Sequence, residues 1–246
     1  MIRDAWTVMR KDLQELRSLR SQGLSGIIST LLILIIFGVI VPWRFGVGWA
    51  AHPASPLLWV WLPWLPAAVV VADTFAGERE RHTLDALYVT RLSNDAILLG
   101  KVGAAALFAW LVALLTLALS AAILAITGSA GSLSLNALLP LAALSLLSAL
   151  LAATLGAVAS LRSSSARHAQ QSAIAAVLSL TGLLIVIGQA IAQYRPTLWH
   201  RMMHAGVPES FTAPKWLLAF AALVLIEIAL LALAARCVGH SRLGLS

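Results

Sequence analysis

Long apolar stretches separated by short polar connections make up most of this chain. The stretches hold about 20 residues or more, the length an α-helix needs to cross a hydrocarbon core of about 30 Å. They lack the apolar–polar alternation, in segments of about ten residues, that is typical of a membrane β-barrel. The pattern predicts an all-α integral membrane protein with one transmembrane domain over 1–246. Six spans are predicted, at 24–41, 57–75, 96–126, 133–161, 172–192 and 216–235.

The composition agrees with this class. Hydrophobic residues make up 60% of the chain and charged residues 11%, whereas soluble domains carry roughly 25% charged residues. Cys237 is the only cysteine, so an internal disulfide is excluded.

The distribution of lysine and arginine predicts the orientation of the spans. With six spans, thirteen of the seventeen basic residues lie on the side of the N-terminus. The other four are Arg44, Arg195, Arg201 and Lys215. Because basic connections stay in the cytoplasm, both termini are expected to be cytoplasmic in a plasma (inner) membrane. The net charge of +7 comes from residues that flank the spans, which favours a lipid membrane over nucleic acid as the partner.

The segment 1–22 before the first span shows the periodicity of an amphipathic helix. Its apolar residues recur at steps of four and three: Ile2, Trp6, Met9, Leu13 and Leu16. This spacing places them on one helical face, with basic residues elsewhere on the wheel. Such a helix either lies along the membrane surface or packs on protein, and the sequence leaves both options open.

A charged connection at 76–95 interrupts the apolar pattern. Five of the ten acidic residues of the chain lie within 72–101. The charges are followed by apolar residues at helical spacing, and Ser93 or Asn94 is predicted to cap the next helix. An amphipathic cytoplasmic segment fixed between two spans would pass the movement of a docked partner to both. The alternative is a solvated loop that only sets topology.

The stretch FAGERERHTLDALYVTRLSNDAILLGK, residues 75–101, resembles the cytoplasmic segment of permease subunits of type-2 ATP-binding-cassette (ABC) exporters. His82 stands where the family usually has glycine, and Arg91 where it usually has proline. The six-span layout and the N-terminal helix extend the resemblance over nearly the whole chain. The matching positions are Glu78, Arg79, Glu80, Arg81, Thr83, Leu84, Asp85, Leu87, Thr90, Ser93, Gly100 and Lys101.

The resemblance implies that this segment is a coupling helix seated in a groove of a separate ATPase subunit. The complete transporter would hold two permeases, either two copies of this chain or one with a paralogue, and two ATPases. The coupling residues would be Glu78, Arg79, Glu80, Arg81, Thr83, Leu84, Asp85 and Leu87.

ATP and Mg would be bound by the partner, so we expect this chain to hold no cofactor and not to be an enzyme. A phosphate-binding P-loop requires Gly-x-x-x-x-Gly-Lys-Ser/Thr. Here Gly100-Lys101 is followed by Val102, and Asp95 takes the place of the first glycine. The sequence therefore lacks the usual means of binding ATP.

The expected function is export of a hydrophobic, lipidic or drug-like substrate. Alternatives within transport are a haem or glycolipid exporter. A non-transporting membrane scaffold and an intramembrane serine protease are rivals from other classes. The protease hypothesis rests on Ser25 in the sequence Gly-Leu-Ser-Gly, but it needs a histidine base inside the membrane, and all six histidines fall in predicted loops or span ends.

Two acidic residues fall within predicted spans. Glu227 lies near the middle of the last span and Asp73 near the cytoplasmic end of the second. An ionisable side chain at such depth marks either a substrate pathway or a buried hydrogen-bonded pair. The fourth span also carries a line of small residues, which predicts close helix packing: Ser145, Ala149, Ala152, Gly156 and Ser160.

His200 and His204 lie four residues apart beside two methionines, so a helix would place both imidazoles on one face. Imidazole and thioether ligands suit copper or haem. Two ligands without a third make a weak metal site, and a short helix in the outer loop is the alternative.

Overall fold

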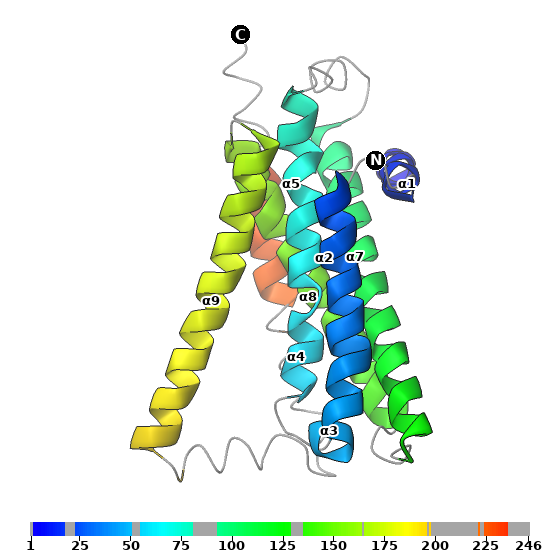
Figure 1. The fold of residues 1–246 in the computed structure, drawn as a ribbon. Helices are drawn as coiled ribbons and strands as arrows, with labels where there is room; N and C mark the ends of the chain where they lie inside the picture. Colours follow the sequence, from blue (N-terminus) through cyan, green and yellow to red (C-terminus); the bar gives the residue numbers. More distant parts are fainter. Residues whose placement is uncertain are drawn as a thin grey trace.

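The computed structural model describes residues 2–17, 23–50, 55–80, 93–128, 135–163, 165–195, 197, 221 and 224–235. In these residues the secondary structure is helical, without strands, which confirms the all-α class. The helices run side by side in a bundle, with α1 placed at one end (Figure 1). They are α1 (Ile2–Arg17), α2 (Gly23–Ile35), the π-helix η1 (Ile36–Ile40), α3 (Val41–Ala50), α4 (Ser55–Trp61), α5 (Trp64–Glu80), α7 (Asn94–Ile126), α8 (Leu135–Arg162) and α9 (Ala166–Tyr194), followed by a last helix, Val224–Ala235.

Among the residues that the structure describes, three helices are long and apolar enough to cross a membrane: Leu58–Glu80, Asp95–Ile126 and Leu141–Arg162. They coincide with the second, third and fourth predicted spans. Two shorter apolar helices, Thr30–Gly46 and Val224–Ala235, overlap the first and sixth. The count of six spans and the side on which the termini lie stay predictions.

The first two predicted spans are less regular than the sequence indicated. The first continues past residue 41 through α3, and Gly46 there has a φ of 50°. The second bends at Leu62 and Pro63, between α4 and α5, because proline has no N–H for the helical hydrogen bond. It then continues to Glu80, so that the first charged residues of the 76–95 connection form the last turn of a membrane helix.

The core of the bundle lies between α5, α7 and α8. Small residues let these helices approach closely, and a Cβ added at Gly156 would lie 3.2 Å from Val71 Cβ. Ala149 and Ser160 are both fully buried. The line of small residues on the fourth span therefore serves helix packing, as predicted, and its partners lie within the chain.

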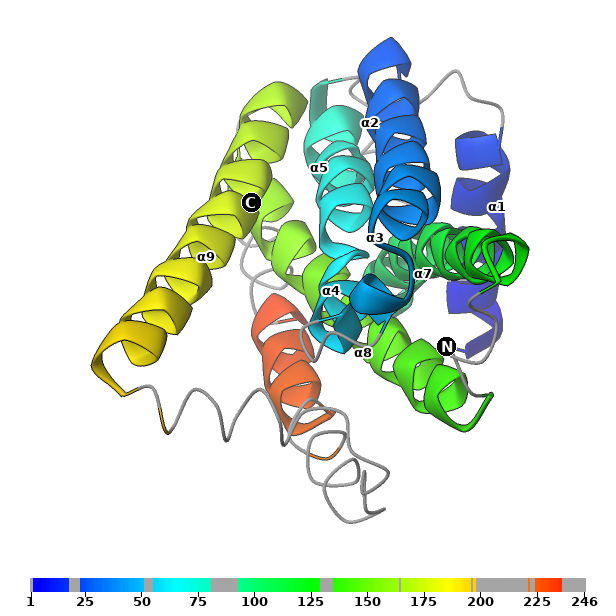
Figure 2. The same cartoon turned by 60° about the horizontal axis from the view of Figure 1, so that its bottom comes forward.

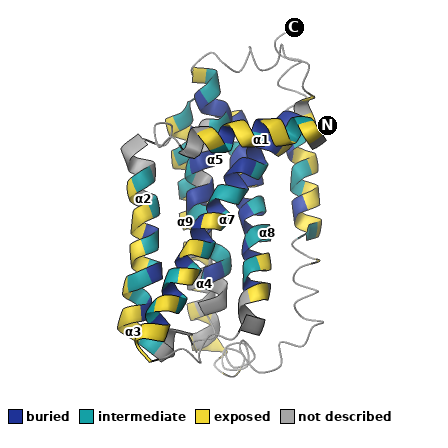
Figure 3. Cartoon of the chain, turned by 90° about the vertical axis from the view of Figure 1, so that its right-hand side faces the viewer, coloured by how far each residue is buried: buried dark blue, intermediate teal, exposed yellow. Residues whose placement is uncertain are grey.

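Helix α1 lies across the end of the bundle, crosswise to the other helices (Figure 3). It crosses α7 so closely that a Cβ at Gly100 would lie 2.7 Å from Val8 Cβ. The predicted helix is present, and Met9 and Leu13 of its apolar face are half-buried, but the face that packs most closely on α7 is turned away from that apolar face. Val8 and Asp12 are buried, whereas Trp6 is 60% exposed. The structure thus supports packing on protein, and Trp6 is left on the free face.

Helix α9 packs on the bundle through its first half. Ala169, Ala173 and Val177 are buried there, and Ala173 and Val177 pack against Trp61 and Trp64. Further along, α9 diverges from its neighbours (Figure 2).

Candidate functional site

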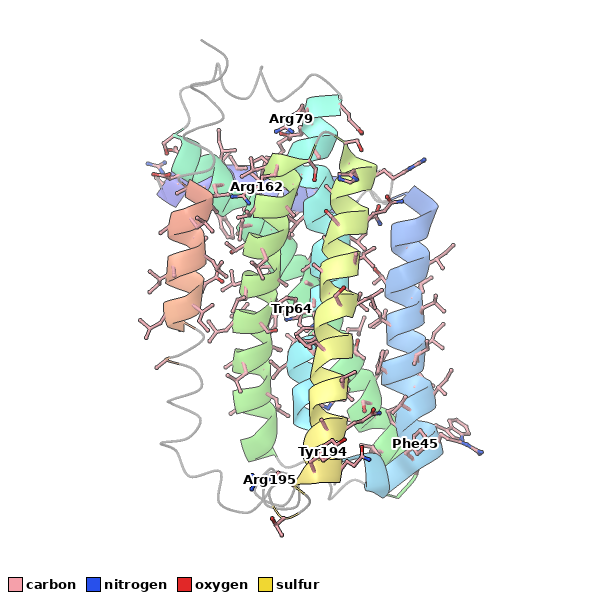
Figure 4. All side chains as sticks on the ribbon, turned by 90° about the vertical axis from the view of Figure 1, so that its left-hand side faces the viewer. Phe45, Trp64, Arg79, Arg162, Tyr194 and Arg195 are labelled. Carbon is pink, nitrogen blue, oxygen red and sulfur yellow. The ribbon has the colours of Figure 1, made fainter. Side chains whose placement is uncertain are left out.

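Charged side chains from α1, α5 and α7 meet at the end of the bundle where α1 lies. The last turns of α5 and α8 and the first turns of α7 and α9 also lie there (Figure 1), and Figure 4 places Arg79 and Arg162 at this end, opposite Tyr194 and Arg195. We call Asp12, Glu78, Arg79, Glu80 and Lys101 the end cluster.

Lys101 of α7 is the centre of the end cluster. Its side chain is 3% exposed, and its Nζ lies 2.8 Å from Glu78 Oε1 and 3.6 Å from Asp12 Oδ2. The Nζ also donates a hydrogen bond of 3.1 Å to Thr74 O and lies 5.5 Å from the centre of the Phe75 ring. Because a buried ammonium is tolerated only when it is paired, these contacts join α7 to both α5 and α1.

Arg79 binds the end of α8. Its Nη1 donates to Ser163 O at 2.6 Å and its Nη2 to Leu161 O at 3.1 Å. The last carbonyls of a helix lack partners within the helix, and a positive charge there is favoured by the helix dipole. Arg79 therefore fixes the C-terminal end of α8 to the last turn of α5.

Glu80 makes the matching contact with α9. Its Oε1 accepts a hydrogen bond of 3.1 Å from the backbone N–H of Ala166, the first residue of that helix. A carboxylate at a helix N-terminus satisfies a free N–H group and is favoured by the dipole. The last turn of α5 thus contacts α7, α8 and α9 through three consecutive side chains.

Helix α7 begins with a side-chain cap. The Ser93 Oγ accepts a hydrogen bond of 3.3 Å from the N–H of Ala96, which confirms Ser93 as the cap rather than Asn94. Residues 81–92 therefore join two anchored points, Glu80 of α5 and Ser93 of α7.

Of the predicted coupling residues, the structure brings Glu78, Arg79 and Glu80 together. Others lie outside the described residues: Arg81, Thr83, Leu84, Asp85 and Leu87, and likewise His82, Thr90, His200 and His204. The side chains of Asp73 and Ser25 are also outside the described set. In the part of the chain that is described, no three or more His, Cys, Asp or Glu residues lie close enough to hold a metal ion.

Sequence reasoning missed Asp12. The hydrophobic periodicity of α1 held no signal for it, because Val8 and Asp12, which are both buried, lie outside the predicted apolar face.

Glu227 lies away from the end cluster, on the last helix. It is 6% exposed, and its Oε1 lies 2.7 Å from the Thr154 hydroxyl of α8. Glu227 therefore forms a separate polar contact inside the bundle.

The comparisons with known proteins place most of the chain in one family. Residues 9–234 match the family described as "ABC-2 family transporter protein". No curated protein sequence matches the chain closely enough to count as a relative.

Proposed function

This chain belongs to the ABC-2 family of transporter proteins, and on that premise we propose that it is the permease subunit of an ATP-driven exporter. Membership implies a membrane transport subunit that is not itself catalytic and that works in general with an ABC ATPase. The proposal adds that this ATPase is a separate chain, that it docks on residues 76–95, and that the cargo is hydrophobic, lipidic or drug-like.

The end cluster is the observation that carries the proposal. Each of its contacts joins two different helices: Lys101 links α7 to α5 and α1, Arg79 links α5 to α8, and Glu80 links α5 to α9. Residues 81–92 are attached to this cluster at one end and to the capped start of α7 at the other. A force applied to the segment would therefore move five helices together.

In the proposed cycle, ATP binding closes two partner ATPases and displaces the docked segment. The linked helices tilt as a unit, and a path between two permeases opens to the outside. This is an alternating-access mechanism. ATP and Mg stay on the partner throughout, and this chain supplies the mechanical connection.

The exposed face of α9 supports a second permease as partner. Exposed residues recur along it at steps of four and three, and all except Val186 are polar or small: His168, Ser172, Ala175, Ser179, Gly182, Val186, Gln189 and Gln193. Polar side chains in a membrane helix are unfavourable against lipid tails, so protein or water should cover this α9 stripe. We place the second permease there.

Cysteine cross-linking tests this placement. With Cys237 replaced by serine, Ser179→Cys and Gln189→Cys are expected to give disulfide-linked dimers in membranes after mild oxidation. Val177→Cys is the matched control, because Val177 is buried within its own chain. Dimers from Val177→Cys, or none from either position of the α9 stripe, would contradict the placement.

The direct test of the proposed function is purification of the tagged chain from its native membrane without cross-linker. An ABC ATPase is expected in equal stoichiometry with the permease. Recovery of the permease without any ATPase, in a form that still transports, would overturn the proposal.

Glu80→Ala tests the coupling. The substitution removes the contact with α9, and we expect ATP hydrolysis stimulated by substrate to fall at least fivefold, the lower end of typical coupling between sites. Binding of the ATPase should persist, since residues 81–92 are unchanged. The measurement is ATPase activity of the reconstituted complex.

Arg167→Ala is the control, because Arg167 is an exposed charged residue in the first turn of α9, at the same end of the bundle but outside the proposed docking segment. A non-transporting scaffold would leave both variants like the unaltered protein, so equal activity in Glu80→Ala would favour that rival.

A further inference from the structure

Glu227 is a buried carboxyl group that has no cationic partner among the described residues. It is 6% exposed and Thr154 is fully buried. No ion pair with Glu227 is formed within the part of the chain that the structure describes. Its second oxygen, Oε2, is also buried and has no hydrogen-bond partner among those residues. Within the described part of the chain, the Thr154 hydroxyl is therefore the one polar contact of this carboxyl.

The Thr154 hydroxyl has two acceptors within reach and only one proton. Its Oγ1 lies 2.7 Å from Glu227 Oε1 and 2.9 Å from Leu150 O. A threonine hydroxyl donates one hydrogen bond and accepts up to two. If Thr154 donates to Leu150 O, the contact with Glu227 is a hydrogen bond only when Glu227 supplies the proton.

We propose that Glu227 is held as a neutral carboxylic acid that donates its proton to Thr154, which in turn donates to Leu150 O. This chain of two hydrogen bonds uses each proton once and leaves no charge on the Glu227–Thr154 pair. It fixes the last helix against α8, with Ala234 fully buried in the core and Leu225 and Ile228 exposed on the outer side.

The competing arrangement is an ionised Glu227 that accepts the Thr154 proton. A carboxylate accepts through both oxygens, yet it would have one hydrogen bond and no cation among the described residues. An ionised group so placed is strongly disfavoured. In the neutral acid, Oε2 is an unpaired carbonyl oxygen, which is a much smaller penalty.

Infrared spectroscopy of the purified protein tests the protonation state. The unaltered protein is expected to show a carbonyl stretching band of a protonated carboxyl group that Glu227→Gln removes. Thr154→Val should move this band to higher frequency, because the acid loses its acceptor. A spectrum in which Glu227→Gln removes a carboxylate band instead would overturn the proposal.

Thermal unfolding gives an independent readout. Glu227→Gln is expected to keep the Tm within about 2 °C, since its amide N–H can donate to the same Thr154 oxygen. Thr154→Val should lower the Tm by about 2–8 °C, because it leaves the buried acid without an acceptor. If Glu227 were ionised, Glu227→Gln would relieve a buried charge and raise the Tm, which would contradict the proposal whatever the role of the end cluster.

Discussion

Replacing Lys101 with methionine is expected to lower the free energy of unfolding by about 3–5 kcal/mol, the usual effect of removing one partner of a buried ion pair. Methionine fills a similar volume but carries no charge. Glu78 and Asp12 would then lose the ammonium group that lies 2.8 Å and 3.6 Å from them. The two carboxylates would repel each other, and α1 and α5 would lose their shared attachment to α7.

The measurement is thermal unfolding in detergent, where this loss corresponds to a fall in Tm of roughly 6–20 °C. Lys101→Arg should recover part of the loss because it keeps the charge. Arg10→Ala is the control, since Arg10 is exposed on α1 and surface changes usually stay within about 0.5 kcal/mol. If Lys101→Met matched Arg10→Ala in stability, the end cluster could not be what holds these helices.

Gly100→Ala is expected to displace α1 from the bundle. The added Cβ would lie 2.7 Å from Val8 Cβ and 2.8 Å from the backbone oxygen of Ala5, distances that require the helices to separate. Overpacking of this kind typically destabilises by about 1–3 kcal/mol. In an exposed helix, replacing glycine with alanine would stabilise the protein by nearly 1 kcal/mol. Even a modest loss of stability in Gly100→Ala would therefore indicate the close contact between α1 and α7.

Gly103→Ala is a matched control in the same helix. Its Cβ would lie 3.2 Å from Met9 Sδ, the end of a flexible side chain that can move away. Trypsin cleavage after Arg10 or Lys11 reports on α1, because a docked helix resists proteolysis. Faster cleavage is expected in Gly100→Ala and not in Gly103→Ala. Equal rates in the two variants would show that close contact at Gly100 is not required.

Much of the architecture was predictable, because apolar length and helical periodicity determine where membrane helices form. Helices α7 and α8 lie within two residues of the predicted ends of their spans. The bend at Pro63 and the π-helix η1 were not predicted. The bend has a local cause, because Pro63 lacks the N–H of a helical hydrogen bond. The π-helix depends on how the chain packs: Gly38 of η1 lies so close to α7 that an added Cβ would be 3.2 Å from Leu119 Cβ.

The site was predictable in part. The charged run and the Gly100-Lys101 pair were recognised from the resemblance. The contact between Glu78 and Lys101, which lie 23 positions apart, was not predicted. Periodicity on α1 favoured a face that includes Trp6, whereas the face that packs on α7 includes Asp12. A hydrophobicity pattern cannot identify such a carboxylate as buried, because its burial depends on a lysine far away in the sequence.

The end cluster also bears on how the protein is made. Asp12 and Glu78 leave the ribosome well before Lys101, since chains are synthesised from the N-terminus at about 5–20 residues per second. During that interval both carboxylates lack the ammonium group that later pairs with them, and α1 has no α7 on which to dock. The packing of α1 and α5 on α7 is therefore completed only after α7 has been synthesised.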